Sequence, residues 1–155
     1  MVMRGLAMNI KSKAIQALMK KVMEEHIAFN KHLGLKVESF EPEAPKLGFD
    51  MRPELIGNPA RQILHGGVIS ATLDVAGGFA IMLSLAAEMP AIPTSFPKMG
   101  TVDLRVDYLR PGRGRHFTAT ARIVRKGSRI AVTHMELVND AGELIATGSA
   151  AYVVG

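Results

Sequence analysis

The chain contains no cysteine and no tryptophan, and only 5% of its 155 residues are aromatic. The absence of cysteine excludes disulfides, thiolate metal sites and a cysteine nucleophile, and it fits a reducing compartment. The first residues also lack the apolar core and cleavage site of a secretory signal, so we expect a cytoplasmic protein. No metal is expected, because the histidines are widely spaced without a ligand pattern: His26, His32, His65, His116 and His134.

Lysine and arginine outnumber aspartate and glutamate by 19 to 14, which gives a net charge of +5 and a pI near 9.7. Such a balance favours nucleic acid, anionic lipid or an anionic metabolite as partner. The charges are scattered, and the sequence has no recognition-helix pattern or stacking motif. We therefore expect no nucleic acid and favour a small polyanionic molecule; the alternative is a merely basic surface.

One long apolar segment, residues 66–87, holds a single charged residue, Asp74. The segment is long enough to be tested as a membrane span. Four glycines, Ser70, Thr72 and Asp74 argue against lipid contact, so we expect a buried helix and no membrane partner. A lone carboxylate in such a helix is costly unless it is satisfied, and chemistry requires one there more often than structure does. The alternative is a structural carboxylate paired with a lysine or arginine.

Hydrophobic periodicity predicts a single α+β domain over residues 1–155. Apolar side chains at three- and four-residue spacing predict a helix over residues 9–32, so that residues 1–32 form an N-terminal helical extension. Hairpin-length connections favour an antiparallel sheet that wraps the central helix with one face. Its strands are predicted from alternating residues: 35–40, 46–52, 101–109, 117–125, 130–139 and 144–153.

The predicted strand over residues 101–109 alternates clearly. Its apolar residues are expected to share one face: Val102, Leu104, Val106 and Tyr108. Its polar residues are expected on the other face: Thr101, Asp103, Arg105 and Asp107. Three prolines, Pro90, Pro93 and Pro97, separate this strand from the central helix.

Two glycines, Gly66 and Gly67, open the central helix directly after His65. The first turn of a helix has unpaired N–H groups and the positive end of the dipole, and glycine lets a ligand approach closely. Such an end can hold a carbonyl oxygen that gains negative charge. His65 could orient a group or donate a hydrogen bond there. The alternative is an ordinary junction between loop and helix.

The spacing between Gly67 and Asp74 predicts a second subunit. Seven residues separate them by roughly 10 Å along a helix, so one reacting carbonyl cannot touch both within a single helix. A two-fold axis would place Asp74 of one subunit opposite Gly67 of the other. Small residues on the same side would allow close approach: Ser70, Ala71 and Gly78. We therefore expect an obligate homodimer with two composite sites.

Three sequence features together resemble the hotdog-fold acyl-CoA thioesterases, in particular the PaaI-like branch. They are the HGG motif at 65–67 with Asp74 nine residues after the histidine, the strand TVDLRVDYLRP, and the KGSR turn. The stretch IGNPARQILHGGVISATLDVAGG is similar to the medium- and long-chain enzymes. The resemblance covers residues 33–153. It implies a hotdog fold, a homodimer that often pairs into a homotetramer, and hydrolysis of fatty or aryl acyl-CoA, with coenzyme A as part of the substrate and no separate cofactor.

The resemblance also implies roles for single residues. Asp74 takes the position of the general base or nucleophile, and the Gly66 N–H, with Gly67 adjacent, takes that of the donor to the thioester carbonyl. Asn58 corresponds to an asparagine near the carbonyl or the catalytic water, although the loop that follows it is one residue longer here. Thr101 occupies the place of a serine or threonine that helps to hold the water.

Basic residues around two predicted turns are candidates for the coenzyme A phosphates, because cations and glycine N–H groups bind phosphate. The preferred contacts are Lys126, Gly127, Ser128 and Arg129, with Arg110 at the other turn. The alternative is a solvated turn. The acyl chain is expected along apolar surface between the subunits, where candidate wall residues, which fit a core role equally well, are Phe79, Met82 and Leu83.

Two other functional classes fit the same residues. One is a hotdog hydratase or dehydratase that acts on enoyl or hydroxyacyl thioesters, and the other is a non-catalytic acyl-CoA-binding module. The sequence leaves open the acyl chain length, an aryl or alkyl preference, the pathway, a dimer or a tetramer, and whether Asp74 activates water or attacks directly.

Overall fold

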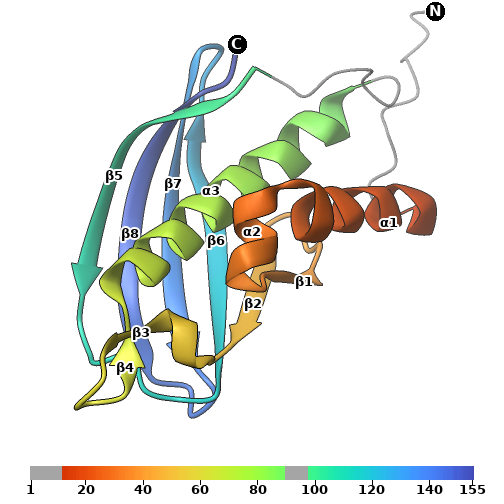
Figure 1. Cartoon of the computed structure of the whole chain (residues 1–155). Coiled ribbons are helices and arrows are strands. Elements are labelled where there is room, and N and C mark those ends of the chain that lie inside the picture. The colour runs from red at the N-terminus through yellow and green to blue at the C-terminus, as the bar shows by residue number, and fades with distance from the viewer. Residues whose placement is uncertain (1–11, 90–97) are drawn as a thin grey trace, which may run out of the picture.

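Six antiparallel strands form one sheet that curves around a long helix (Figure 1). The computed structural model describes residues 12–89 and 98–155. Strands follow the order β1-β2-β6-β7-β8-β5 across the sheet. Each strand lies within two residues of its predicted bounds: β1 (Lys36–Ser39), β2 (Lys46–Asp50), β5 (Gly100–Tyr108), β6 (His116–Lys126), β7 (Ile130–Asn139) and β8 (Leu144–Val153). The expectations for residues 1–11 and for Pro90, Pro93 and Pro97 lie outside the described residues.

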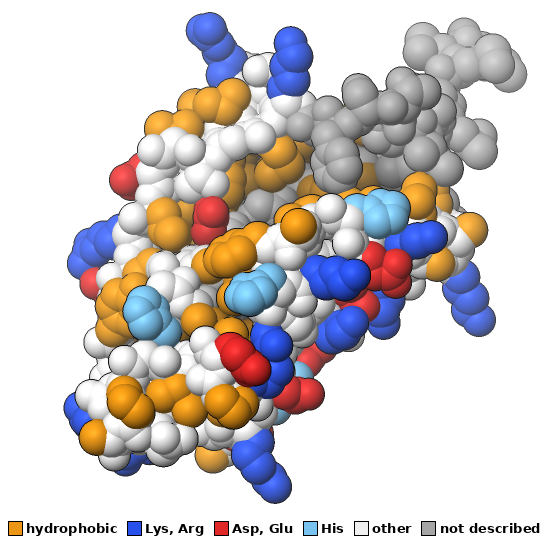
Figure 2. Space-filling model, in the orientation of Figure 1, with side chains coloured by type: hydrophobic (Ala, Val, Ile, Leu, Met, Phe, Trp, Pro, Cys, Tyr) orange, Lys and Arg blue, Asp and Glu red, His pale blue; other side chains and the backbone are white. Residues whose placement is uncertain are grey.

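The central helix α3 (Gly66–Glu88) confirms the prediction of a long buried helix. The strands that contact it carry small buried residues, among them Ala119, Ala121, Ala146, Gly148 and Ala150. By length and composition α3 could cross a membrane, but 56% of its most apolar window is buried inside the protein. Core packing therefore accounts for much of its apolar length. Figure 2 shows hydrophobic side chains over α3, between charged side chains that project at the edges.

The segment before α3 contains a 3₁₀-helix and two short strands. After the 3₁₀-helix η2 (Pro53–Leu55), the strands β3 (Ile56–Asn58) and β4 (Ile63–Leu64) form a small hairpin. The N–H of His65 donates to the carbonyl of Leu55 at 2.8 Å, and that of Leu64 donates to Gly112 at 3.0 Å. These bonds fix the position at which α3 begins.

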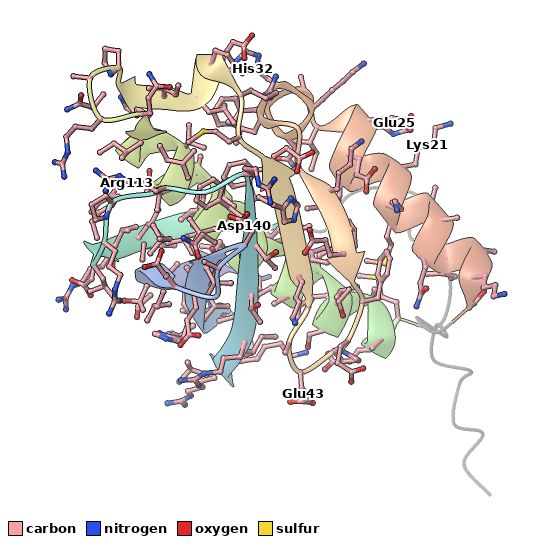
Figure 3. All side chains as sticks on the ribbon, turned by 90° about the horizontal axis from the view of Figure 1, so that it is seen from below. Lys21, Glu25, His32, Glu43, Arg113 and Asp140 are labelled. Carbon is pink, nitrogen blue, oxygen red and sulfur yellow. The ribbon has the colours of Figure 1, made fainter. Side chains whose placement is uncertain are left out.

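Within the described residues the N-terminal segment is helical, as predicted, but it is not one continuous helix. The described part divides into α1 (Lys13–Lys21), the π-helix η1 (Val22–His26) and α2 (Ala28–Leu33). Ile27, between η1 and α2, has an extended backbone with φ −83° and ψ 101°. Figure 3 shows these helices beside β1 and β2, with Lys21 and Glu25 pointing away from the sheet.

Tertiary hydrogen bonds explain the division. The buried carboxylate of Glu24 accepts from the N–H of Val37 at 2.8 Å and from Nζ of Lys36 at 3.2 Å. Nδ2 of Asn30 donates to the carbonyl of Met23 at 3.0 Å. Glu24 thus attaches the helical segment to β1, and Asn30 satisfies a carbonyl that a regular helix would bond internally. Periodicity carries no information about either contact.

A β-bulge in β5 overturns one detail of the predicted alternation. Thr101 is opposite Tyr152 on β8, but the next paired residue of β5 is Asp103, opposite Ala151. Val102 is the extra residue, and it is 61% exposed. Because a bulge shifts the side-chain phase, Thr101 lies on the same face as Leu104, the face toward α3, instead of opposite it. The expectation that Thr101 lies on the outer face was wrong.

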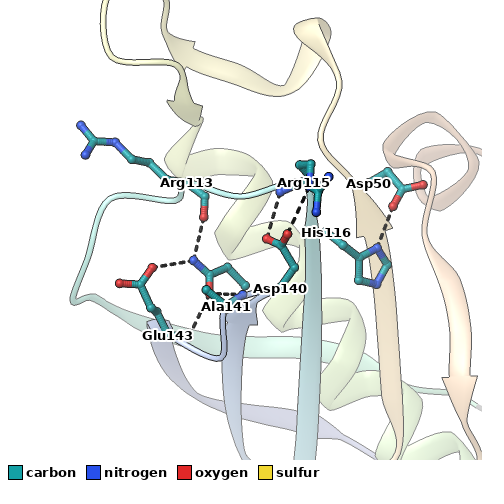
Figure 4. A network of polar contacts seen from close by, with 8 residues as sticks. Asp50, Arg113, Arg115, His116, Asp140, Ala141 and Glu143 are labelled. Atoms are coloured by element: carbon teal, nitrogen blue, oxygen red, sulfur yellow. Dashed lines mark hydrogen bonds and ion pairs between the residues drawn. The ribbon is translucent and has the colours of Figure 1, made fainter.

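Polar side chains join the strands at one end of the sheet (Figure 4). His116 lies between two carboxylates, with Nδ1 2.7 Å from Asp50 and Nε2 2.5 Å from Glu38. The hydrogen bond with Asp50 raises the pKa of His116 above its usual value; partial burial opposes this, and Glu38 adds to it. The imidazole therefore links β1, β2 and β6 most strongly when it is protonated.

Candidate active site

The lone carboxylate of α3 is satisfied by two hydroxyl groups. Oδ1 of Asp74 accepts from Oγ1 of Thr101 at 2.8 Å and from the hydroxyl of Tyr152 at 3.2 Å. The Tyr152 hydroxyl is also 2.8 Å from the backbone carbonyl of Asp74. Among the described residues, hydroxyls and not a lysine or arginine hold this side chain. Since both bond to Oδ1, Oδ2 is the oxygen left to take up a proton.

Tyr152 is a component of this site that the sequence analysis missed. Its side chain is only 2% exposed. Burial raises the pKa of Tyr152, and the charge and hydrogen bond of Asp74 raise it further. The phenol therefore remains a protonated donor to the carboxylate. In the sequence, its position near the end of a predicted strand indicated only an ordinary aromatic residue of the core.

The backbone of α3 makes room for the Tyr152 hydroxyl at Gly77. A Cβ at this position would lie 2.4 Å from the Tyr152 hydroxyl and 2.7 Å from Oγ1 of Thr133. At the neighbouring Gly78 the nearest atom to such a Cβ would be 3.5 Å away, on Met99. Gly77 is thus required by the contact between Tyr152 and Asp74, and Gly78 is not.

The start of α3 holds the predicted oxyanion donors. Nδ1 of His65 caps the helix by accepting from the N–H of Gly67 at 2.8 Å. The hydroxyl of Tyr108, also missed by the sequence analysis, donates to the carbonyl of Gly66 at 3.1 Å. Since the Gly67 N–H is taken by the cap, the geometry favours the N–H of Gly66, which has no acceptor within the helix. His65 acts here on the backbone of its own turn.

Within one protomer the glycine donors and Asp74 do not meet. Gly66 and Asp74 lie on the same uninterrupted helix, so about 12 Å of helix axis separates them. Asn58 is also apart from the carboxylate: its Oδ1 accepts from the N–H of Arg61 at 3.2 Å and shapes the hairpin turn. The structure therefore brings Asp74 and Thr101 together, while His65, Gly66, Gly67 and Asn58 lie before or at the helix start.

The residues predicted to bind coenzyme A lie at two opposite ends of the sheet. Arg110 donates to the carbonyl of Leu144, where β8 begins. The turn after β6 lies beside the other end of β8, where the N–H of Val154 donates to the carbonyl of Arg129. Because β8 has ten residues, about 30 Å separates its two ends. Arg110 and Arg129 are not gathered into one cluster.

Two residues of the KGSR turn already have partners within the fold. Nζ of Lys126 donates to Oγ of Ser84 at 2.8 Å and pairs with Glu88 at the end of α3. The N–H of Gly127 closes the turn by donating to the carbonyl of Ile130 at 2.9 Å. Of the four predicted contacts, Ser128 and Arg129 are left as exposed groups.

A cavity of about 260 Å³ opens beside Asp74. Polar groups line one part of it, including Asp74, Thr101 and Tyr152, and apolar side chains line much of the rest: Met23, Ile27, Val75, Phe79, Met82 and Met99. Two of the predicted acyl-wall residues, Phe79 and Met82, are therefore in the lining. Leu83 is 1% exposed and belongs to the core.

Metal ligation has no support in residues 12–89 and 98–155, where no group of three or more His, Asp or Glu side chains is placed to hold an ion. The polar groups that line the cavity are the carboxylate of Asp74, two hydroxyls and the amide of Asn30. Such a set can activate or hold a water molecule without a metal. The chemistry available at this site is therefore proton transfer or direct attack by a carboxylate.

Comparison with known proteins defines the class. The Thioesterase superfamily matches residues 61–146, more than half of the chain, and the chain belongs to this family. It is similar to the medium/long-chain acyl-CoA thioesterase YigI of Escherichia coli K12, with 44% identity over 135 residues that cover 84% of this chain and 87% of the relative. The family membership confirms the predicted resemblance at the level of the superfamily.

Solved structures confirm the hotdog fold. A crystal structure of a Shewanella oneidensis protein related to the thioesterase superfamily matches with a TM-score of 0.82 and 40% identity, over 93% of this chain and all (100%) of that one. The PaaI protein of the E. coli phenylacetic acid degradation operon matches with a TM-score of 0.74 and 22% identity, over 93% of this chain and 96% of that one. The second likeness concerns the fold alone.

Proposed function

We propose that the protein is an acyl-CoA thioesterase that hydrolyses fatty or aryl acyl-CoA to the free acid and coenzyme A. The observation that carries this proposal is the Asp74 carboxylate, held by Thr101 and Tyr152 beside a largely apolar cavity. The similarity to YigI, a medium/long-chain acyl-CoA thioesterase, supports an acyl-CoA substrate. A thioester carbonyl is already electrophilic, so one carboxylate and one positioned water suffice.

In the proposed reaction, Oδ2 of Asp74 takes a proton from water as the water oxygen bonds to the thioester carbon. The carbonyl oxygen becomes an oxyanion that the Gly66 N–H stabilises at the positive end of α3. The carbon–sulfur bond then breaks, and the proton passes from Asp74 to the departing sulfur. Direct attack by Asp74, followed by hydrolysis of the resulting anhydride, gives the same acid and thiol.

The site is proposed to be shared by two copies of the chain. Gly66 and Asp74 are too far apart on one helix, and a two-fold axis would bring Asp74 of one protomer opposite the glycine of the other. β5 is an edge strand of the sheet. Two of its hydrophobic side chains, Val102 and Tyr108, are 61% and 55% exposed, and Leu109, directly after the strand, is 49% exposed. A homodimer would bury this exposed apolar edge, and we propose that dimers pair into a homotetramer in the cytoplasm.

A mixed dimer tests the shared site. Asp74→Ala on one chain and Gly66→Pro, which removes the N–H, on the other would leave one intact composite site. We expect each homodimer to be inactive and the mixed dimer to recover up to half of the wild-type activity. A folded mixed dimer without recovery contradicts the shared site.

Thiol release from a panel of acyl-CoA substrates tests the activity. We expect turnover that is lost in Asp74→Asn. The absence of thiol release from every aliphatic and aryl ester, with folded protein present, would overturn the proposal. Hydration of enoyl-CoA, followed by absorbance, would instead identify a hydratase, and binding of acyl-CoA without turnover would identify a binding module.

For coenzyme A, we propose contacts to Ser128 and Arg129, the exposed residues of the turn after β6. A cationic guanidinium and a hydroxyl suit a phosphate group. Arg129→Ala is expected to raise KM for acyl-CoA and leave kcat nearly unchanged, because the phosphate is remote from the reacting carbonyl. An unchanged KM would exclude this turn as the phosphate contact.

A further inference from the structure

The geometry points to the π-helix η1 and the adjoining Ile27 as the wall that limits the length of the acyl chain. This inference rests on the proposed thioesterase function and names the part of the chain that selects among its substrates. The acyl tail would lie inside one protomer, between α3 and the N-terminal helices. This differs from the expectation, drawn from the sequence, of a tail between the subunits.

The cavity connects the reacting group with this wall. Asp74, Thr101 and Tyr152 supply its polar lining together with Asn30. Met82 and Phe79 of α3 and Met99 form apolar lining, and Met23 and Ile27 add to it from the N-terminal segment. A thioester carbonyl held at Asp74 would therefore direct its alkyl chain along a lining that is mostly apolar. Methionines suit this role because their unbranched side chains adapt to a flexible ligand.

The break between η1 and α2 places both wall residues. In a continuous helix, Met23 and Ile27 would be one turn apart with regular backbone. Here the N–H of Ile27 donates to the carbonyl of Val22, five residues earlier, and Ile27 is extended. π-turns of this kind occur frequently at functional sites. The hydrogen bonds of Glu24 to β1 and of Asn30 to Met23 hold the break in position.

The size of the cavity implies a limit. Its volume of about 260 Å³ falls just below the range of roughly 300–1,000 Å³ that is usual for small-molecule sites. Each methylene that enters an apolar pocket should raise kcat/KM roughly fourfold. We expect this rise to stop at the chain length at which the tail meets Ile27 and Met23.

Substitutions at Ile27 test the inference. Ile27 is half-buried, so it tolerates changes that the core would not. With saturated acyl-CoA substrates of increasing length, Ile27→Ala should move the optimum of kcat/KM to longer chains, and Ile27→Phe should move it to shorter ones. Met23→Ala should act in the same direction as Ile27→Ala. The matched control is Met19→Ala, because Met19 is a buried methionine of the same helical segment that does not line the cavity.

The outcomes separate this inference from the proposed function. Chain-length profiles that coincide for wild type, Ile27→Ala and Ile27→Phe, with turnover intact, would overturn the inference and leave the thioesterase activity standing. An absence of turnover would overturn the proposed function. Calorimetric binding of free fatty acids of the same lengths then decides the inference, which fails if Ile27→Phe does not shorten the longest acid that binds.

Discussion

Thr101 and Tyr152 are directly opposite each other on β5 and β8, and both hydroxyls donate to the same oxygen of Asp74. Two neighbouring strands therefore orient one carboxylate of the helix that they enclose. A side chain with two fixed donors loses its freedom to rotate, which is the requirement for a positioned base. The site depends on the register of the sheet as much as on the identity of its residues.

Asp74→Asn is expected to remove most of the activity without unfolding the protein. The amide oxygen can still accept from Thr101 and Tyr152, but the amide cannot take a proton from water. We expect kcat to fall by roughly 100- to 10,000-fold, measured as thiol release, with an unchanged circular dichroism spectrum. Retention of more than a tenth of the wild-type kcat would show that another group is the base.

Deletion of Val102 is expected to leave the site active. Val102 is the extra residue of the bulge, so that without it Thr101 stays opposite Tyr152, and Asp103 opposite Ala151, in a regular ladder. Thr101→Val is the matched contrast, because it keeps the register and removes the donor to Asp74. Loss of a hydrogen bond to a charged group should lower kcat, measured as thiol release, by roughly tenfold or more. Equal activities of the two variants would contradict this account of the register.

Gly77→Ala and Gly78→Ala are expected to have opposite effects on stability. A Cβ at Gly77 would lie 2.4 Å from the Tyr152 hydroxyl, so the helix and the sheet must separate, at a cost of about 1–3 kcal/mol. At Gly78 the added methyl group meets its nearest atom at 3.5 Å, and alanine favours a helix by up to about 1 kcal/mol. Urea unfolding of both variants measures the difference between their free energies of unfolding. Equal values would contradict the account in which Tyr152 requires a residue without Cβ at position 77.

The contribution of His116 to stability is expected to depend on pH. Its folded pKa is raised, chiefly by Asp50, so protonation favours the folded state. The contribution is fully present below the unfolded pKa of about 6.5 and is lost as the pH rises through the folded value. The difference in urea midpoint between wild type and His116→Gln should therefore shrink from pH 6 to pH 8. A difference in urea midpoint that grows from pH 6 to pH 8 would contradict the prediction that protonated His116 stabilises the fold.

Tyr152→Phe is expected to weaken both stability and catalysis, because it removes a buried donor from Asp74. We expect a loss of about 1–3 kcal/mol in the free energy of unfolding and a lower kcat with little change in KM. In a spectrophotometric titration, wild type should show a tyrosine that ionises above its ordinary pH range, and the variant should not. A purely structural role would leave kcat unchanged once the variant is folded.

Strand and helix positions could be predicted because they follow from local patterns. The bounds of α3, β7 and β8 needed only apolar periodicity and the turn residues between them. Asp74 became a candidate site residue because it is the one charged residue in an apolar helix, and the structure adds that its partners are hydroxyls. The sequence also indicated Thr101, but only through a resemblance, since simple alternation assigns this residue to the wrong face.

The remaining features depend on contacts between distant segments. The division of the N-terminal helix rests on Glu24 and Asn30, whose partners are not determined by periodicity. The bulge at Val102 is visible only in the pairing of β5 with β8. Tyr152 gains its role because Gly77, 75 positions earlier, lets its hydroxyl reach the helix. Tertiary packing decides all three.

The two tyrosines of the chain give the proposed site an optical signal of its own. Tyr152 donates to Asp74, Tyr108 donates to the carbonyl of Gly66, and there is no tryptophan to mask them. Intrinsic fluorescence therefore originates beside the carboxylate and beside the helix start. Binding of an acyl-CoA to the inactive Asp74→Asn protein can be followed by this emission without any attached label.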